Sequence, residues 1–478
     1  MSPRPALSLL AALLASGLAG CAAGALTHPP LDTPMPAAYA AGDAQWQPAQ
    51  DWSAQPAGAW WQVFADPELD TLQQQLEAHN QSLAAQLAAY DQAQAAVRQA
   101  QASYWPALGA SLGDTRARTA TAAGVNEQAS AEVTASWVPD LWGKVREQVR
   151  AQRANAQASA ATLRNVRLSL QATLAQSYLQ LRVVDAQRRL AQQAVDDTGK
   201  ALELTQNRYR AGVASAADVA SARTAYLQAQ TSLTDLGVTR AQLQNAIAVL
   251  VGQPPSSFRL AEREALPAIP AIPPGLPADL LQRRPDIATA RAQVEAANAQ
   301  VGVAKSAWFP TLTLGGSAGH SAARLADVFS APVLLWSLGP QLAANLFDGG
   351  ARRAQVRSSE AGYRQAVANY RQAVMAALQG VENQLAAQRI LATEAEQQAQ
   401  VVQAAEDALR LAQNQYKAGL APYLNVLTAQ STAINARNAE LTLRNRRYAA
   451  AVALIQALGG AWDPPPAGTA QAPGNAGG

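Results

Sequence analysis

The chain of 478 residues contains two copies of one long unit, displaced by about 205 residues. Three short motifs of the first copy recur in the second: Tyr104-Trp105-Pro106 as Trp308-Phe309-Pro310, Leu141-Trp142-Gly143 as Leu346-Phe347-Asp348-Gly349, and Arg208-Tyr209-Arg210-Ala211-Gly212-Val213 as Gln415-Tyr416-Lys417-Ala418-Gly419-Leu420. This period far exceeds that of solenoid repeats, so the duplicated unit has the size of a domain. We expect the copies at residues 63–251 and 278–460, joined by a proline-rich linker at 252–277 that cannot be helical.

Long helices are predicted to dominate each copy. Apolar side chains step by three or four residues along 142–208 and 349–415, and each stretch of 67 residues would extend about 100 Å as a helix. Shorter helices would lie along each long one, at 66–102 and 215–251 in the first copy and at 278–306 and 421–458 in the second. In the last of these, every seventh residue is apolar, which is typical of a coiled-coil seam: Leu427, Ile434, Leu441, Tyr448 and Ile455.

Shorter segments alternate between apolar and polar residues and predict strands. The longest run is 333–347, where Leu334, Trp336 and Leu338 alternate with polar or small residues, and weaker runs lie near 108–112, 131–137 and 311–314. They would form hairpins at about 104–141 and 308–348. Pro340 in the longest run predicts a bulge or bend. Beyond the N-terminus no segment has about 18 uninterrupted apolar residues, so strands would have to cross a membrane.

Aromatic residues cluster where the predicted helices give way to strands. Tyr104, Trp105, Trp308 and Phe309 occupy these positions. Aromatic side chains are enriched at membrane interfaces, so we expect these four at the edge of a bilayer.

Four strands would leave two open sheet edges, which lipid does not tolerate. Two chains would supply eight strands, a barrel filled by its own side chains, whereas three would supply twelve and begin to enclose water. The predicted fold is therefore mainly α with a small membrane β part, in which a homotrimer forms a 12-strand β-barrel on an α-helical barrel.

The N-terminus resembles an export signal followed by a lipid attachment site. Arg4 precedes an apolar run that ends in Leu18-Ala19-Gly20-Cys21, which looks like a bacterial lipobox. Residues 1–20 would then be a cleaved signal peptide and Cys21 the lipidated first residue of the mature chain; the alternative is a soluble periplasmic protein. Two or three acyl chains anchor a protein durably. We expect residues 21–62 to pack at the middle of the helices, with the linker, as a belt, and 461–478 to be a flexible tail.

The duplicated turn between long and short helices predicts two similar exposed tips. Gly212 and Gly419 would take the left-handed conformation that ends a helix, and Val213 and Leu420 follow them. Ser215-Ala216-Ala217-Asp218 has the form of a capping box, and Pro422 suits a first helical position. The two tips could serve as docking surfaces for another coiled-coil protein.

Several functional classes are disfavoured. His28, His79 and His320 are scattered and Cys21 is the sole cysteine, so we expect no metal site and no cofactor. The formal charge of +3 gives no polycationic face for nucleic acid. Gly109-Ala110-Ser111-Leu112-Gly113 fits the G-x-S-x-G pattern, but a nucleophile elbow needs a helix directly after its strand, and a Gly/Thr-rich loop follows here. We therefore expect no enzymatic activity.

Motifs spread over the chain resemble those of outer-membrane factors of the TolC superfamily, specifically the NodT-type lipoproteins of RND efflux pumps. The resemblance runs from Trp60 to Trp462, and its more specific elements are Asp140-Leu141-Trp142-Gly143, Arg284-Pro285-Asp286-Ile287 and Leu346-Phe347-Asp348-Gly349-Gly350. It implies a trimeric exit duct in the outer membrane that conducts substrates passively from the periplasm. Its implied partners are a periplasmic adaptor protein and an inner-membrane RND transporter, whose assembly opens the duct.

The resemblance also implies a constricted periplasmic aperture. Related proteins often carry acidic residues just after the second tip, where this chain has Asn425 and Thr428. Tyr416 corresponds to a tyrosine that bonds across helices in the family, and Asp218 is the acid that remains near the first tip. We expect this neutral aperture to bind multivalent cations weakly.

Two other functions fit parts of the pattern. One is the exit duct of a type I protein-secretion exporter. The lipobox favours an efflux duct over this alternative. The other is a lipid-anchored periplasmic coiled-coil scaffold, which the amphipathic strands disfavour. The transported substrate, the pump and the opening trigger are not encoded in any motif.

Overall fold

The computed structural model describes residues 36, 40, 59–118, 125–263, 265–270, 272, 283–330 and 334–460. They fall into two compact modules. The strand module comprises the described parts of Ala88–Ala161 and Thr289–Gln372, and the helical module those of Pro34–Leu87, Thr162–Ala288 and Ala373–Gly478. Each module therefore combines parts of both sequence repeats. The predicted signal peptide (1–20), Cys21 and the predicted tail (461–478) lie outside the described residues, as do parts of the predicted linker.

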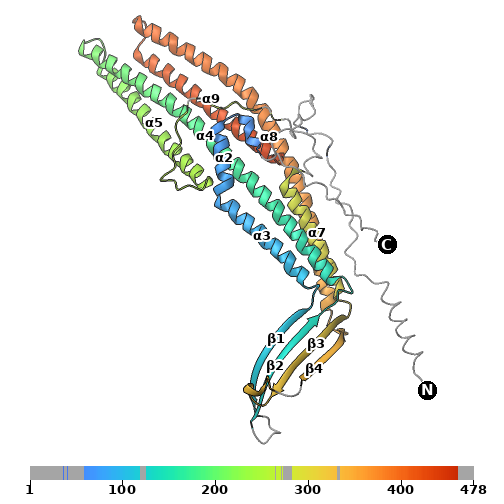
Figure 1. Cartoon of the computed structure of the whole chain (residues 1–478). Helices are drawn as coiled ribbons and strands as arrows, with labels where there is room; N and C mark the ends of the chain where they lie inside the picture. Colours follow the sequence, from blue (N-terminus) through green and yellow to red (C-terminus); the bar gives the residue numbers. More distant parts are fainter. Residues whose placement is uncertain are drawn as a thin grey trace, which may run out of the picture. The chain divides into compact units, whose positions relative to one another are not determined.

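The strand module contains one four-stranded antiparallel sheet in the order β1-β2-β3-β4 (Figure 1). The strands are β1 (Ala107–Ala117), β2 (Asn126–Trp137), β3 (Thr311–Ala322) and β4 (Leu334–Ala343). Each repeat supplies one hairpin, and β2 pairs with β3 to join them. The register of β3 and β4 runs without interruption through the pair Leu314 and Pro340, so the prediction of a bulge at Pro340 was wrong, while the alternative prediction of a local bend is not tested by the register. A strand at the sheet edge tolerates proline, because proline lacks an N–H and the outer side of an edge strand has no neighbouring strand to receive a hydrogen bond.

Long helices cross from one module into the other along the chain. These are α3 (Gln81–Ala102), α4 (Lys144–Arg210), α7 (Pro285–Ser306) and α8 (Ala351–Lys417). Both α4 and α8 have 67 residues, the predicted length, and each begins two residues later than expected. In the strand module, α7 approaches α4 closely at Gly302, where an added Cβ would lie 2.8 Å from Cγ of Glu147.

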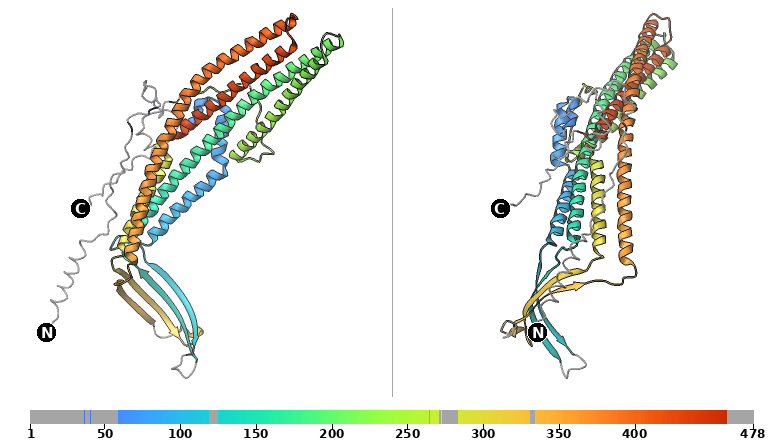
Figure 2. Two further views of the ribbon diagram at one scale, coloured as in Figure 1. Left: turned by 180° about the vertical axis from the view of Figure 1, so that it is seen from behind. Right: turned by 90° about the vertical axis from the view of Figure 1, so that its right-hand side faces the viewer.

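In the helical module, α4 and α8 continue into two helical hairpins that lie side by side (Figure 1, Figure 2). Their second arms are α5 (Ala216–Leu250) and α9 (Tyr423–Ala457). The sides of α9 that pack toward α8 carry small and medium side chains, as in the clusters of Ala405 with Ala433 and Ala436, and of Leu391 with Leu443. Leu427 and Ile434 of the predicted heptad seam instead border a groove between α4, α5 and α9.

The helix expected at 66–102 is divided into α2 (Pro67–His79) and α3. Asn80 interrupts it, because its side-chain oxygen accepts a hydrogen bond from the Leu83 N–H at 2.9 Å and its amide donates to the Leu250 carbonyl at 2.8 Å. An asparagine at this position starts a new helix. Before α2, the short helix η2 (Trp60–Phe64) buries three aromatic side chains: Trp60, Trp61 and Phe64.

Candidate functional site

The strand register divides the sheet into two chemically distinct faces. Residues opposite one another share a face, so the pairs Ser111 with Glu132 and Ser317 with Ser337 lie on one side. The other side carries the pairs Leu108 with Ala135 and Leu312 with Leu342, together with Val133, Trp336 and Leu338. Leu335 is an apolar exception on the polar side. One face thus suits lipid and the other suits water.

The four predicted interface aromatics lie at the helix-to-strand junctions, in different surroundings. Phe309 stacks on Trp142 with a centroid distance of 4.9 Å and an interplanar angle of 16°. The Arg352 guanidinium lies 5.0 Å from the Trp308 ring centroid, and the Tyr104 carbonyl accepts a hydrogen bond from the Trp137 indole at 3.0 Å. Trp105, by contrast, is 75% exposed.

Both helical hairpins turn through the same left-handed motif at their tips. Gly212 and Gly419 have φ angles of 76° and 73°. The N–H of the next residue, Val213 or Leu420, donates to the carbonyl five residues before it, at 2.8 and 2.9 Å. This is the Schellman arrangement, in which the apolar residue after glycine usually packs on the helix. Here Val213 and Leu420 are 65% and 80% exposed, so each tip presents an apolar side chain to its surroundings.

Aromatic and cationic side chains connect the two tips. The Arg208 guanidinium, near the end of α4, lies 4.8 Å from the ring centroid of Tyr416, near the end of α8. Tyr416 in turn contacts Tyr423 of α9 at a centroid distance of 5.3 Å. Tyr423 packs with Ala222 of α5 and Val426 in a small apolar cluster. Burial raises the pKa of Tyr423 to about 12, and its hydroxyl has no hydrogen-bond partner among the described residues.

Asp218 belongs to the capping box that begins α5, as predicted. Its carboxylate accepts hydrogen bonds from the Ser215 N–H at 2.9 Å and the Ser215 hydroxyl at 2.8 Å, while its own N–H donates to the Ser215 oxygen. These bonds, with a smaller contribution from Arg208, lower the pKa of Asp218. Pro422 is the N-cap residue of α9 rather than its first helical residue, so that expectation was wrong by one position.

Asn425 and Thr428 lie one turn apart on α9, and both are exposed. The Thr428 hydroxyl donates to the Leu424 carbonyl of its own helix at 3.0 Å. The structure therefore places Arg208 against the Tyr416 ring and close enough to Asp218 to help lower its pKa, whereas Asn425 and Thr428 are exposed within the chain. Neither provides a formal charge.

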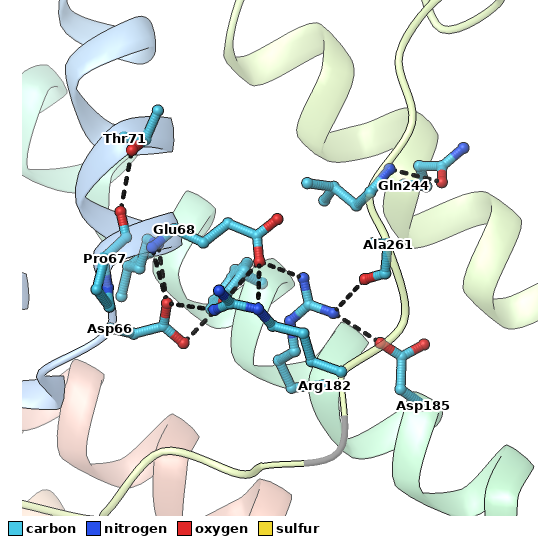
Figure 3. Close-up of polar contacts among 12 residues, drawn as sticks. Asp66, Pro67, Glu68, Thr71, Arg182, Asp185, Gln244 and Ala261 are labelled. Carbon is cyan, nitrogen blue, oxygen red and sulfur yellow. Dashed lines mark hydrogen bonds and ion pairs between the residues drawn. The ribbon is translucent and has the colours of Figure 1, made fainter.

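A buried ionic cluster in the helical module was not anticipated (Figure 3). Arg182 of α4 is fully buried and donates to Asp185 at 2.8 Å, to Glu68 at 2.9 Å and to the Ala261 carbonyl at 2.8 Å. Asp185, also fully buried, accepts a further bond from Arg240 of α5 at 2.8 Å. Buried charges need such partners.

The cluster connects the start of α2 and the linker to the long helix. Asp66 accepts a hydrogen bond from the Tyr178 hydroxyl at 2.8 Å and contacts Arg263 of the linker at 3.3 Å. The sequence signal was a pair of opposite charges, Arg182 and Asp185, three residues apart within an apolar stretch of α4. Because the cluster lies far from both tips, we interpret its role as structural: it holds the start of α2 and the linker against α4.

Neither a helical membrane span nor a metal site appears in the part of the chain that the structure describes. None of its helices is apolar over a window long enough to cross a bilayer. Nor does any group of three or more His, Cys, Asp or Glu side chains there form a site for a metal ion. Ser111 lies within β1, opposite Glu132, so the strand continues where a nucleophile elbow would turn.

An amphipathic sheet and long helical hairpins in one chain are features of membrane channel proteins. The chain belongs to the outer membrane efflux protein family, whose model matches residues 72–253 and 276–460. It is accordingly mainly helical with a small strand part, and it is an outer membrane efflux channel.

Similarity to characterised proteins extends over nearly the whole chain. The chain is 34% identical to the pyoverdine export outer membrane protein OpmQ of Pseudomonas aeruginosa, over 95% of this chain and 97% of OpmQ. Its structure resembles the outer membrane protein VceC of Vibrio cholerae, with 30% identity, a TM-score of 0.75, and coverage of 85% of this chain and 99% of VceC. The open outer membrane channel MtrE of Neisseria gonorrhoeae has 26% identity, a TM-score of 0.77, and coverage of 92% and 98%.

Proposed function

We propose that three copies of this chain close a twelve-stranded barrel that conducts substrates across the outer membrane. The observation that carries this proposal is the sheet itself, which has one apolar face, one polar face and, within the described residues, two unpaired edges. The strands have 10 to 12 residues, enough for a tilted strand to cross a bilayer. Because β1 and β4 run in opposite directions, the β4 edge of one copy can pair with the β1 edge of the next in the same antiparallel way.

The helices then extend the bore as an α-helical barrel into the periplasm. The 67 residues of α4 and of α8 each span about 100 Å, which supports a long tunnel rather than a simple pore. Cys21, with its diacylglyceryl group, would hold the N-terminus in the outer membrane beside the barrel. Tyr104, Trp105, Trp308 and Phe309 would lie near the periplasmic interface of that membrane.

The tips would form the periplasmic entrance, with Asn425, Thr428, Tyr416 and Asp218 around the aperture. A periplasmic adaptor would dock on Gly212, Val213, Gly419 and Leu420, and an inner-membrane RND transporter would supply the energy. The exposure of Val213 and Leu420 supports this surface, as does the nearby groove of about 520 Å³ between α4, α5 and α9. Assembly with these partners would open the duct.

The proposal is tested with the purified full chain in detergent and in planar bilayers. Light scattering should give the mass of a trimer, and the bilayer should show stepwise conductance. A Leu338→Lys variant, which places a charge on the apolar face, should insert poorly, whereas Ser337→Lys on the polar face should insert normally. A monomer without conductance would refute the proposal.

A second experiment addresses the aperture. A trivalent cation added on the periplasmic side should block the wild-type channel weakly, because Asn425 and Thr428 are neutral. Replacing both with aspartate should strengthen the block by at least tenfold. Strong block of the wild type at low cation concentration would exclude a neutral aperture.

A further inference from the structure

One aromatic contact joins the two hairpins of a single chain. Trp142, which follows β2, stacks on Phe309, which precedes β3, with the rings 4.9 Å apart and nearly parallel at 16°. The Trp142 indole N–H also donates to the Pro310 carbonyl at 2.6 Å. This contact lies at the helix-side end of the junction between β2 and β3, where the strand of one repeat meets the strand of the other.

The internal repeat gives both rings a counterpart at the open edges of the sheet. Trp142 matches Phe347, which follows β4, and Phe309 matches Trp105, which precedes β1. Within one chain these two counterparts lie at opposite edges, because β4 and β1 are the outermost strands. Phe347 is 88% exposed and Trp105 is 75% exposed. Phe347 and Trp105 therefore do not stack on each other within a single chain.

If the strand register is extended, Phe347 lies on the same face of the sheet as Ala107, which follows Trp105 by two residues. Ala343 lies opposite Thr311, on the face shared by Ser136 and Ala107. Phe347 is four residues beyond Ala343, so an extension of β4 would place its side chain on the same face. The backbone from 344 to 348 leaves strand pairing at the open edge, although the sequence predicted a strand up to residue 347.

A cavity of about 470 Å³ lies at the helix-side end of β1, β2 and β3, and Trp142 and Phe309 are among its lining residues. Its lining includes Trp105, Ala107, Ser136, Trp137 and Thr311. Ala107, Ser136 and Thr311 of that shared face border the cavity together with Trp137 and Leu312 of the opposite face, and Trp105 forms part of its aromatic wall. Asp140, Lys144 and Gln148 also line the cavity, so a phenyl ring that stacks on Trp105 would lie beside both apolar and polar side chains.

We propose that Phe347 of one copy stacks on Trp105 of the next copy, repeating between chains the Trp142–Phe309 contact within each chain. The partner of the Trp105 ring is thus a second copy of this chain, through its 344–348 segment. This inference rests on the proposed trimer, because only ring closure brings β4 of one copy beside β1 of the next. It identifies a pair of aromatic residues that sets the register in which β4 of one copy pairs with β1 of the next.

Cysteine cross-linking of the full chain in isolated outer membranes tests the pairing. The double variant Trp105→Cys/Phe347→Cys, treated with a short bis-maleimide, should give covalent dimers and trimers on denaturing gels. Either single variant should remain monomeric on these gels. The matched control Trp105→Cys/Phe329→Cys should also remain monomeric, because Phe329, 79% exposed, follows β3 at the opposite end of the strands.

A thermal measurement covers the case in which the cysteine variants fold poorly. Phe347→Ala should lower the temperature at which trimers dissociate in detergent by several degrees, whereas Phe347→Tyr, which keeps the ring, should not. Trp105→Ala combined with Phe347→Ala should add little to either single change, because both remove the same contact. Trimers that conduct ions but neither cross-link through 105 and 347 nor respond to Phe347→Ala would overturn this inference and leave the proposed function intact. A wild-type chain that is monomeric would instead overturn the proposed function.

Discussion

The Arg208 guanidinium lies over the ring of Tyr416, 4.8 Å from its centroid, and so links the end of α4 to the end of α8. These residues are 208 positions apart in the chain but occupy nearly equivalent places in the two repeats. Arg208 also contributes to the lowered pKa of Asp218, at the start of α5. One cation therefore connects both hairpin tips, and its removal should loosen them relative to one another.

Replacing Arg208 with alanine should increase hydrogen exchange at both tips, in peptides covering 205–213 and 413–420. A cation–π contact at an exposed site contributes about 0.5–1 kcal/mol, which corresponds to about two- to fivefold faster exchange. Hydrogen-exchange mass spectrometry of the detergent-solubilised protein measures this. Arg410→Ala is the control, since Arg410 pairs with Asp407 on its own helix at 3.0 Å. Equal exchange in the two variants would show that the tips are not coupled through Arg208.

The start of α5 should become less protected from exchange in acid. Asp218 has a lowered pKa in the folded chain, because the Ser215 N–H and hydroxyl donate to its carboxylate. A carboxyl with a depressed folded pKa contributes stability that is complete above its ordinary pKa of about 4 and is lost as the pH falls through the folded value. Protection of residues 215–222 should therefore decrease below about pH 4 in the wild type. In Asp218→Asn the corresponding loss should be absent, and an identical pH profile in both proteins would contradict the assignment.

Removing Asp185 should destabilise the helical module strongly. Its carboxylate pairs with Arg182 and Arg240, each at 2.8 Å, and Arg182 is fully buried. Deleting one partner of a buried ion pair costs about 3–5 kcal/mol, since the remaining charge stays desolvated. Denaturant unfolding of Asp185→Ala should show this loss, whereas Glu406→Ala, which breaks an exposed pair with Arg437, should cost about 0–1 kcal/mol. Similar losses of unfolding free energy in the two variants would mean that water can take the place of the Asp185 carboxylate beside Arg182 and Arg240.

Features set by local chemistry could be predicted from the sequence. Gly212 and Gly419 end their helices with positive φ, because a glycine after a helical stretch takes this conformation without steric cost. The capping box of Ser215 and Asp218 depends on residues only three positions apart. The long helices and the alternating strands follow from periodicity in the same way.

Features that depend on distant residues could not be predicted. Arg263 reaches Asp66 across 197 positions, and nothing in either segment specifies the other. Asn80 also donates to the Leu250 carbonyl, 170 positions away, and only its bond from the Leu83 N–H is local. For the tip residues, the sequence indicated which residues lie there, whereas the contact of Arg208 with Tyr416 required the packing of two hairpins.

Glycine-to-alanine changes at Gly252 and Gly212 should differ greatly, although both residues have positive φ, 72° and 76°. A Cβ at Gly212 would meet nothing within 4 Å, so Gly212→Ala should cost only the strain of the left-handed backbone, about 1–2 kcal/mol. A Cβ at Gly252 would lie 2.4 Å from the His79 carbonyl oxygen, a backbone atom that cannot move without displacing the α2–α3 break. Gly252→Ala should therefore lower the unfolding temperature far more than Gly212→Ala. Thermal unfolding of both variants and the wild type compares them directly, and equal shifts would show that the His79 carbonyl does not lie against Gly252.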